Sequence, residues 1–275
     1  MRFSFLRSSV NGPTYLRGVW SADRVAFVTL LCLLPPLGVA IADKGLPLLI
    51  IVALSIIVAV GWQACFALVR KRQIGWDGIG TAIIFALIVG DTDPLWQVAL
   101  AVTFGIVLGE QIFGGRGFNF LNPAVVALAF LTFSFSGASF AEPALWFGIA
   151  TVPAAILLIA TRLISWRMVV GIIAGLVTIG ILNGHGFQPE LLGGGFLFIV
   201  VFLACDPVAS SSTNLGRWVN GLLIGCLAWV FTPYGGSPTG PEALIPAILL
   251  ASVFAPLIDT LVVMLNTYAR RRLDV

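Results

Sequence analysis

The chain has 275 residues, of which 59% are hydrophobic and 10% are charged, and its mean hydropathy is +1.05. A soluble domain of this length needs far more charge to cover its surface, so the composition excludes a soluble globular protein. The apolar runs are continuous rather than alternating, which excludes a membrane β-barrel. The sequence therefore predicts an all-α polytopic membrane protein.

The apolar runs divide the chain into about ten transmembrane helices. These segments are predicted over residues 25–42, 46–69, 78–90, 95–113, 121–135, 144–161, 168–182, 193–205, 218–232 and 243–265. We interpret residues 25–265 as a single ten-helix membrane domain, which follows a cytoplasmic N-terminal arm (1–24) and precedes a basic cytoplasmic tail (266–275). Runs of about 20 apolar residues are long enough to cross a bilayer.

The charges test this topology. If the N-terminus is cytoplasmic, every Lys and Arg except Lys44 falls on the cytoplasmic side, whereas Asp43, Asp91, Asp93 and Glu142 are among the acidic residues of the outer loops. This asymmetry is the positive-inside pattern of a multi-pass protein of a bacterial-type inner membrane, with both termini cytoplasmic. The net charge of +3 is therefore a signal of topology, and we expect no nucleic-acid partner.

Two predicted segments, 78–90 and 121–135, are too short for a full crossing and are flanked by Gly, Pro, Asn or Asp. Such segments indicate discontinuous helices, which are tolerated where protein or a cavity surrounds the freed backbone. A weak internal echo links GGRGFNFLNPAVVALAF (114–130) to GGSPTGPEALIPAILLASVF (235–254). With five spans on each side, the echo leaves two inverted repeats and chance similarity equally open.

The stretch around residues 117–123 combines a glycine turn with two asparagines. Asn122 followed by Pro123 is typical of a helix N-cap and first turn, which accounts for both residues structurally. That interpretation leaves Gly117 and Asn119 unexplained. Two amides between phenylalanines also suit a planar heteroaromatic ligand, because each amide can donate and accept.

Four acidic residues lie in or near apolar segments. Asp259 falls inside the last segment, where a carboxylate is costly and marks an ion-path candidate. Asp206 is equally consistent with an ion-path residue and with a cap of its own turn. For Asp77 and Glu110, solvation at the membrane interface is the favoured interpretation.

Three motifs in chain order resemble those of the NqrB/RnfD family, the flavin-carrying membrane subunits of the Na+-translocating NADH:quinone reductase and of the Rnf ferredoxin:NAD+ oxidoreductase. EQIFGGRGFNFLNPAVV (110–126) is similar to the family's Gly-Gly-x-Gly-x-Asn-x-x-Asn-Pro-Ala segment. ACDPVASSSTNLGRWVNGLLIG (204–225) is similar to its Thr-Asp-Pro-Val-x-Ala-x-x-Thr-Asn-x-Gly motif, and ILLASVFAPLIDTLVV (248–263) to its last helix.

The resemblance implies a ten-helix fold of two inverted five-helix repeats with broken helices, which carries flavin. By this match Asn119 and Asn122 would hydrogen-bond a non-covalent riboflavin or FMN, and Gly117 would allow close approach of the backbone. The same resemblance assigns Thr213 and Asn214 to cofactor binding.

The family also carries a second FMN, joined through its phosphate to a threonine in a Ser/Thr-Gly-Ala-Thr motif on the outer side. Here Ser136, Gly137, Ala138 and Ser139 follow the order of that motif, so Ser139 would be the covalent acceptor. The connection is shorter than the family's, serine replaces threonine, and Phe133 stands where an Asp is usual. An ordinary loop that has lost the flavin site is the slightly favoured alternative.

These observations predict a flavoprotein subunit that transfers electrons within or across the bilayer of an Nqr/Rnf-like complex, with or without coupling to Na+ or H+ translocation. The sequence contains no Gly-x-Gly-x-x-Gly nucleotide-binding unit and no Cys cluster, so the other subunits of the complex are expected partners, together with membrane lipid and a quinone. A small-solute channel or transporter of related inverted-repeat architecture is the alternative. A structural subunit that only seats partner proteins is a third.

Overall fold

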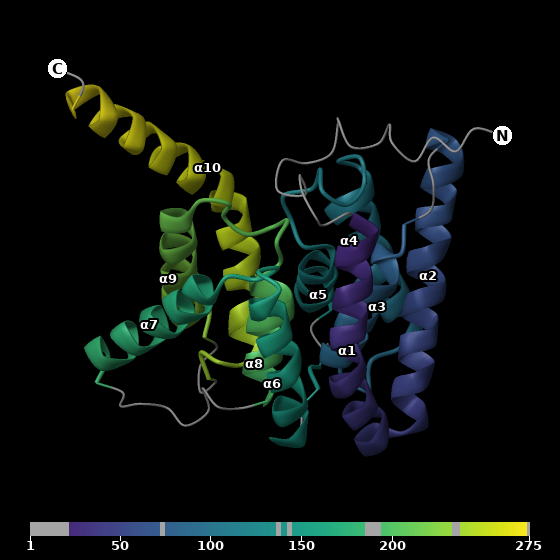
Figure 1. Ribbon diagram of the computed structural model, residues 1–275. Coiled ribbons are helices and arrows are strands. Elements are labelled where there is room, and N and C mark those ends of the chain that lie inside the picture. The colour runs from purple at the N-terminus through teal and green to yellow at the C-terminus, as the bar shows by residue number, and fades with distance from the viewer. Residues whose placement is uncertain are drawn as a thin grey trace.

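A computed structural model describes residues 22–71, 75–135, 139–141, 145–184, 194–232 and 237–273. These residues are almost entirely helical, and within the described ranges the β-structure is a single isolated bridge between Val89 and Phe140. The elements are α1 (Ala22–Lys44), α2 (Leu46–Arg70), α3 (Asp77–Ile88), α4 (Leu95–Ile106), the π-helical η2 (Val107–Gln111), α5 (Pro123–Ser134), α6 (Leu145–Ala160), α7 (Trp166–Leu182), α8 (Gly194–Ile199), the π-helical η4 (Val200–Ala204), α9 (Asn214–Val230) and α10 (Pro241–Leu273) (Figure 1).

Every predicted segment overlaps a helix, which confirms the all-α class. Three described helices, over Arg24–Lys44, Leu46–Arg70 and Pro241–Tyr268, are long and apolar enough to cross a membrane alone. The short segments are confirmed as short helices, because α3 and α5 have 12 residues each and rise only about 18 Å. A count of ten crossings therefore remains a prediction. The protein is a helical membrane protein whose core contains short helices.

The helices form two groups, α1–α5 and α6–α10, which lie on opposite sides of the view in Figure 1. Corresponding pairs pack in each group: α1 on α3 and α6 on α8, α2 on α4 and α7 on α9, α4 on α5 and α9 on α10. The groups meet where α1 packs on α6 and α5 on α10. This arrangement buries the short helices in the middle of the molecule.

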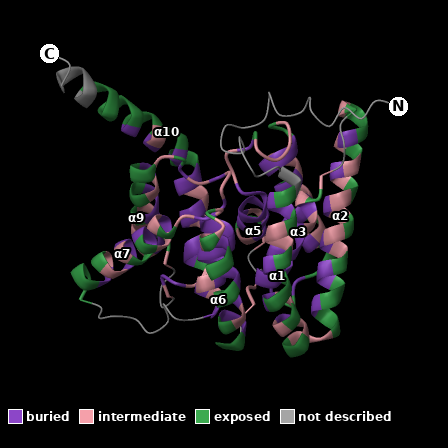
Figure 2. Ribbon diagram, in the orientation of Figure 1, coloured by how far each residue is buried: buried purple, intermediate pink, exposed green. Residues whose placement is uncertain are grey.

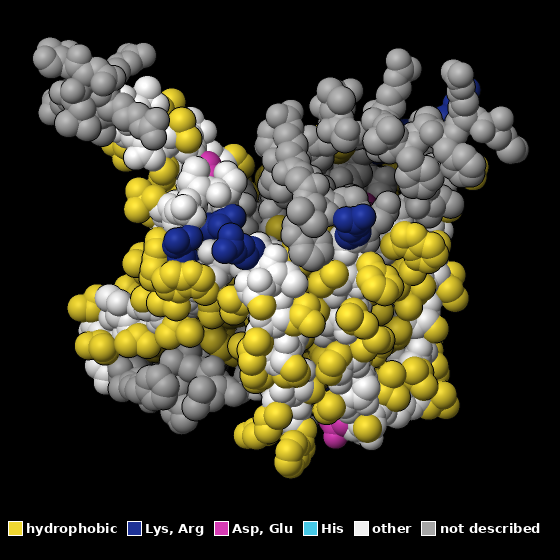
Figure 3. Space-filling model, viewed as in Figure 1, with side chains coloured by type: hydrophobic (Ala, Val, Ile, Leu, Met, Phe, Trp, Pro, Cys, Tyr) yellow, Lys and Arg dark blue, Asp and Glu magenta, His cyan; other side chains and the backbone are white. Residues whose placement is uncertain are grey.

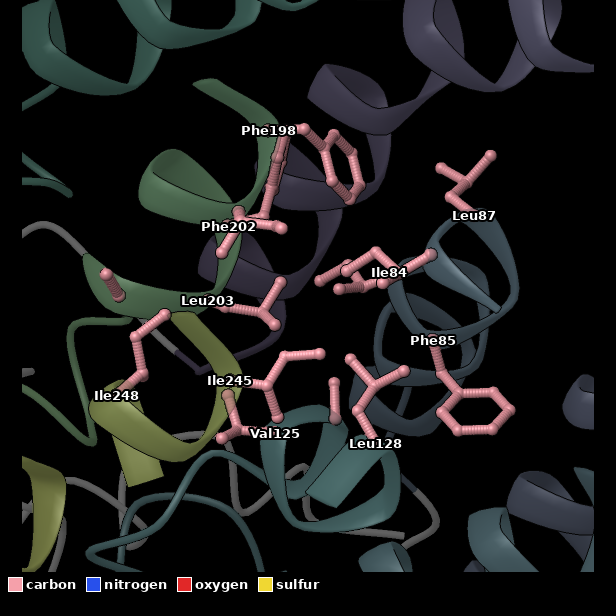
Figure 4. Packing of buried hydrophobic residues seen from close by; sticks show 14 of the residues in the cluster. Ile84, Phe85, Leu87, Val125, Leu128, Phe198, Phe202, Leu203, Ile245 and Ile248 are labelled. Carbon is pink, nitrogen blue, oxygen red and sulfur yellow. The ribbon is translucent and has the colours of Figure 1, made fainter. Parts of the chain in front are cut away.

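The core lies where α3, α5, α8–η4 and the first half of α10 converge. Figure 4 shows Phe85, Leu128, Phe198, Leu203 and Ile248 among the apolar side chains that fill this region. Buried residues gather on these central helices, whereas α2, α6 and α7 turn many exposed residues outward (Figure 2). The outward faces are largely hydrophobic and form a hydrophobic band in the view of Figure 3, as contact with lipid requires.

Contacts between helix ends agree with the predicted sidedness. Arg70 Nη2, at the end of α2, donates a hydrogen bond to the carbonyl oxygen of Gln111, at the end of η2, and both ends are predicted to be cytoplasmic. On the opposite side Lys44 pairs with Asp91 at 2.8 Å, as two outer loops should. Figure 3 shows Lys and Arg above most of the hydrophobic band and an acidic side chain at its lower edge.

Helices α7 and α9 cross at unusually short range because four glycines face each other. A Cβ atom on Gly175 would lie 2.6 Å from the Leu222 carbonyl oxygen, and one on Gly225 would lie 2.4 Å from that of Ile172. Gly171 and Gly221 make the adjoining contact one turn away. This small-residue packing is a common way for helices to associate within lipid.

Candidate functional site

The loop between η2 and α5 is shaped by its glycines and closed by Asn119. Gly117 has a φ of 94°, a conformation that L side chains rarely adopt. Its N–H donates to Asn119 Oδ1 at 3.0 Å, and Asn119 Nδ2 donates to the Leu121 carbonyl oxygen at 2.6 Å. Both ends of the Asn119 amide are thus used by the loop. These bonds give Asn119 a structural role that needs no ligand. Its expected contact with a flavin stays a prediction.

Asn122 begins α5 and also reaches the second helix group. Its Oδ1 accepts from the N–H of Ala124 at 2.9 Å, so the predicted N-cap is present, with Pro123 in the first turn. Its Nδ2 donates at 3.5 Å and 3.4 Å to the carbonyl oxygens of Phe202 and Leu203 in η4. The side chain is buried and ties the start of one broken helix to another.

Asn122 lines a pocket between the two helix groups, which we call the central pocket. Its atom-free space is about 610 Å³ when the solvent that opens into it is counted as well. Its walls come from α1, α3, η4 and the end of α6, with apolar residues such as Ile84, Leu158 and Phe202. The residues with polar side chains are Thr29, Trp76, Asp77, Thr81, Arg116, Asn122, Cys205 and Asp206. An apolar cavity with a few convergent polar groups is the usual form of a small-molecule site.

Arg116 supplies the positive charge of the central pocket. Its Nε lies 3.7 Å from Asp77 Oδ1 and its Nη2 lies 3.5 Å from Asp206 Oδ1. Asp206 is buried, and its Oδ1 also accepts from the N–H of Val208 at 3.0 Å. The turn-capping hydrogen bond expected of Asp206 is therefore present in the structure, and the same carboxylate forms an ion pair with Arg116 at the pocket. Asp77, which was expected to be solvated at the membrane interface, is partly buried and paired with Arg116.

Asp259 fastens the loop before α9 to α10. Its carboxylate accepts hydrogen bonds from the hydroxyls of Ser211, Ser212 and Thr213 at 2.5, 3.0 and 2.6 Å. It also accepts from the N–H groups of Ser212 and Thr213 at 2.7 and 3.1 Å. Thr213 in turn caps α9 by accepting from the N–H of Gly216 at 3.1 Å. This network accounts for an acidic residue inside the last predicted segment.

We expect Asp259→Ala to lower the free energy of unfolding by about 2 kcal/mol, because it leaves these donors without their charged acceptor. Thermal unfolding of the detergent-solubilised chain measures the loss. Thr260→Ala is the matched control, since its exposed hydroxyl bonds only within α10. Equal melting temperatures for the two variants would contradict the fastening role.

Thr213 and Asn214 lie apart from the central pocket. Thr213 is engaged by Asp259, and Asn214 Oδ1 accepts from Arg167 Nη1 at 2.8 Å on the exposed surface. Neither belongs to the described lining of the pocket. Their assignment to cofactor binding stays a prediction that the geometry of this state does not favour.

Ser139 lies on the side of the molecule opposite the central pocket's loop, next to a buried carboxyl. Its N–H and hydroxyl donate to Asp93 Oδ1 at 3.1 and 3.3 Å, and its hydroxyl lies 2.9 Å from Thr92 Oγ1. Burial raises the pKa of the Asp93 carboxyl, and the bonds from Ser139 partly offset the rise. Residues 136–138 of the predicted attachment motif lie outside the described residues. The Ser139 hydroxyl is half-buried, and its covalent modification stays a prediction.

The interpretation of Glu110 as a solvated interfacial residue is wrong. Its side chain is 1% exposed and lies in η2, behind the loop that carries Arg116.

Arg116 and Cys205 were not predicted from the sequence as pocket residues. The sequence did offer one signal for Arg116: it lies within a Gly-Gly-Arg-Gly turn shortly before a short predicted helix.

Comparison with known proteins matches the chain to the model of the NQR2, RnfD, RnfE family in two overlapping pieces, residues 9–147 and 137–267. Three relatives are each named as the B subunit of the Na(+)-translocating NADH-quinone reductase. That of Stutzerimonas stutzeri (strain A1501) is 34% identical, with 80% of this chain and 68% of the relative covered. That of Ectopseudomonas mendocina (strain ymp) is 35% identical, with 79% and 67% covered, and that of Pseudomonas aeruginosa (strain LESB58) is 34% identical, with 76% and 65% covered.

The chain thus spans about two thirds of the length of these relatives. The alignment to the first runs over 276 positions although it covers only 80% of the 275-residue chain, so the relative carries residues that this chain lacks. Since the family model matches most of the chain in order and relatives above 30% identity agree, the resemblance of the sequence motifs is confirmed: the chain belongs to the NQR2, RnfD, RnfE family.

Proposed function

We propose that this protein is a membrane subunit of an Nqr- or Rnf-like redox complex, in which it carries non-covalent flavin and passes electrons within or across the bilayer. Family membership and the names of the relatives support the complex. The observation that carries the flavin proposal is the central pocket, into which the family's asparagine motif places Asn122 beside Arg116.

The residues of the central pocket fit a flavin. The polar edge of an isoalloxazine presents both donors and acceptors, and the pocket offers Asn122 and Arg116 as donors together with Thr29, Thr81 and Asp206. Apolar walls can cover the rest of the ring. A flavin bound there would supply one- and two-electron transfer.

The chain's own contribution would be to orient the ring and to set its electrostatic surroundings. Asn122 is held at a helix start and cannot rotate without losing its cap. Its Nδ2 makes only long bonds, at 3.5 and 3.4 Å, to the Phe202 and Leu203 carbonyl oxygens, and it is the part of the amide that a ring could engage. The Arg116 charge favours a negatively charged ring, while Asp77 and Asp206 limit that effect. Leu158 and Ile164 exclude water from the α6 side.

We also infer that the two helix groups are inverted repeats. Three packed pairs of the first group, α1–α3, α2–α4 and α4–α5, have counterparts in α6–α8, α7–α9 and α9–α10, and this supports a two-fold relation between the groups. The central pocket lies at the junction of the groups, as sites in inverted-repeat membrane proteins usually do.

The proposal does not include covalent FMN at Ser139 or ion-path roles for Asp206 and Asp259. The two pieces of the family match overlap at residues 137–147, where the sequence motif predicts a shortened connection, and this supports loss of the covalent site. The bonds made by Asp206 and Asp259 support structural roles for both. The donor subunit and the quinone are expected from the relatives' names alone.

The test is the colour of the purified chain. After mild detergent extraction we expect a flavin absorption spectrum, with flavin released into the supernatant on denaturation. In a denaturing gel, fluorescence that vanishes in Ser139→Ala would show covalent attachment. A colourless protein that takes up solute in liposomes would overturn the flavin proposal in favour of a transporter.

A further inference from the structure

A second polar cavity, which we call the side pocket, lies between α2, η2 and the loop that follows η2. It encloses about 600 Å³ of atom-free space, including open solvent. Its charged and amide side chains are Gln63, Arg70, Asp77, Glu110, Gln111 and Arg116. The flavin proposal uses only Asp77 and Arg116, which also line the central pocket.

Glu110 is the buried acid of the side pocket. Its Oε1 accepts a hydrogen bond from Gln111 Nε2 at 2.9 Å. Its Oε2 is fully buried and has no hydrogen-bond partner among the described residues. Burying an ionised carboxylate with one oxygen unsatisfied is costly, and a bound proton removes that cost.

The Gln63 amide bears on the state of the Glu110 carboxyl. Its backbone neighbours favour one orientation, in which Nε2 donates to the Gly75 carbonyl oxygen at 3.2 Å and Oε1 accepts from the Gly78 N–H at 2.9 Å. The opposite orientation would point Nε2 at Glu110 Oε1, 3.3 Å away, and would lose both backbone bonds. The favoured orientation turns the amide oxygen toward Glu110, so the hydrogen between the two groups has to come from the carboxyl.

The amide can approach the backbone because residue 78 is glycine. A Cβ atom there would lie 2.5 Å from the Gln63 side-chain amide. Gly78 is in the first turn of α3, next to Asp77, whose carboxylate pairs with Arg116. The orientation of Gln63 is therefore linked to the start of a broken helix that also borders the central pocket.

We propose that Glu110 is a proton-binding site. In the protonated state its O–H bond donates to Gln63 Oε1, and Gln63 holds Gly75 and Gly78. When the O–H bond breaks, the proton passes to water in the side pocket, the amide rotates to donate to the carboxylate, and the two backbone bonds are lost. The site binds and releases a proton whether or not the chain carries flavin.

The charges that face Glu110 come from several elements. Arg116 favours the ionised carboxyl, whereas Asp77 and Asp206 oppose it. Arg70 on α2 is occupied by the Gln111 carbonyl oxygen and the Phe66 ring, and Cys65 on that helix is exposed. Helices α4 and α5, which pack against η2, have no titratable side chain in their sequences.

Infrared difference spectroscopy of the purified full chain in lipid nanodiscs, recorded as the pH is raised, tests the site. We expect the carbonyl band of one buried carboxylic acid per chain to disappear as carboxylate bands grow. Glu110→Gln should lose this band. Glu242→Gln should keep it, because Glu242 is an exposed acid at the start of α10.

Gln63→Met distinguishes a proton site from a merely buried acid, and it decides the question even if Glu110→Gln does not fold. The band should remain but shift in frequency, because the carboxyl has lost its acceptor. A band that is absent at every pH at which the chain is folded, or that is unaltered in both variants, overturns the proposal. So does a carboxylate band that responds to added Na+ and not to pH, which would mark a cation site.

Discussion

Asn122→Ser should lower the flavin retained by the purified protein about five-fold or more, because the loss of a buried amide partner costs roughly 1–3 kcal/mol of binding free energy. Serine is an equally good N-cap, so its hydroxyl can still accept from the Ala124 N–H and hold the start of α5. The substitution removes Nδ2, which reaches toward η4 across the central pocket. Flavin per chain, measured by absorbance after size-exclusion chromatography, gives the result.

Two comparisons make this result interpretable. Asn266→Ser changes the same residue type at an exposed position on α10 and should leave flavin content unchanged. Flavin-free Asn122→Ser should melt somewhat below flavin-free wild type, because the Phe202 and Leu203 carbonyl oxygens lose a donor, but it should still unfold in one cooperative transition, which separates ligand loss from unfolding. If Asn122→Ser and wild type retain equal flavin, the central pocket is not the flavin site.

Gly225→Leu should prevent α7 and α9 from packing and lower the free energy of unfolding by about 3 kcal/mol or more, at or above the usual range for overpacking. The usual range applies to neighbouring side chains that can move. Here the new Cβ would lie 2.4 Å from the Ile172 carbonyl oxygen and 2.7 Å from the Leu176 nitrogen, and neither backbone atom can yield without separating the helices. We expect aggregation on extraction, seen as loss of the monodisperse chromatographic peak.

Gly61→Leu is the matched control for this change. Gly61 is also in a long helix, but a Cβ at this position meets nothing within 4 Å. Leucine has a higher helix propensity than glycine by about 0.8 kcal/mol, so this variant should be as stable as wild type or slightly more stable. Similar losses in both variants would mean that helix propensity, and not the crossing of α7 and α9, governs the effect.

The helical class and the helix positions were predictable because they depend on composition and local pattern. A continuous apolar run in lipid must satisfy its own backbone, and a helix does so within the segment. The N-cap at Asn122 was predictable for the same reason, since the cap and the first turn are neighbours in sequence. The boundary at residue 265 was less accurate, because α10 continues to Leu273 through the predicted tail.

The roles of the polar residues were less predictable, because their partners lie far away along the chain. The sequence marked Asp259 as a buried charge, yet its partners are the hydroxyls of residues 211–213, which only the packing of α9 on α10 brings within reach. Glu110 stands at the end of an apolar run and was expected to be solvated. Its carboxyl is instead buried beside Gln63, which lies 47 residues earlier on α2, and no local pattern encodes that contact.

The amino-acid order by itself determined the helical membrane class, the glycine turn and the family. These follow from the solubility of each segment and from contacts between neighbouring residues. Only the tertiary structure decided that Asn122 and not Asn119 faces the central pocket, that Arg116 joins Asp77 to Asp206, and that Glu110 and Gln63 share a buried site. Each of these depends on the distance between helices, which is fixed by how whole helices pack.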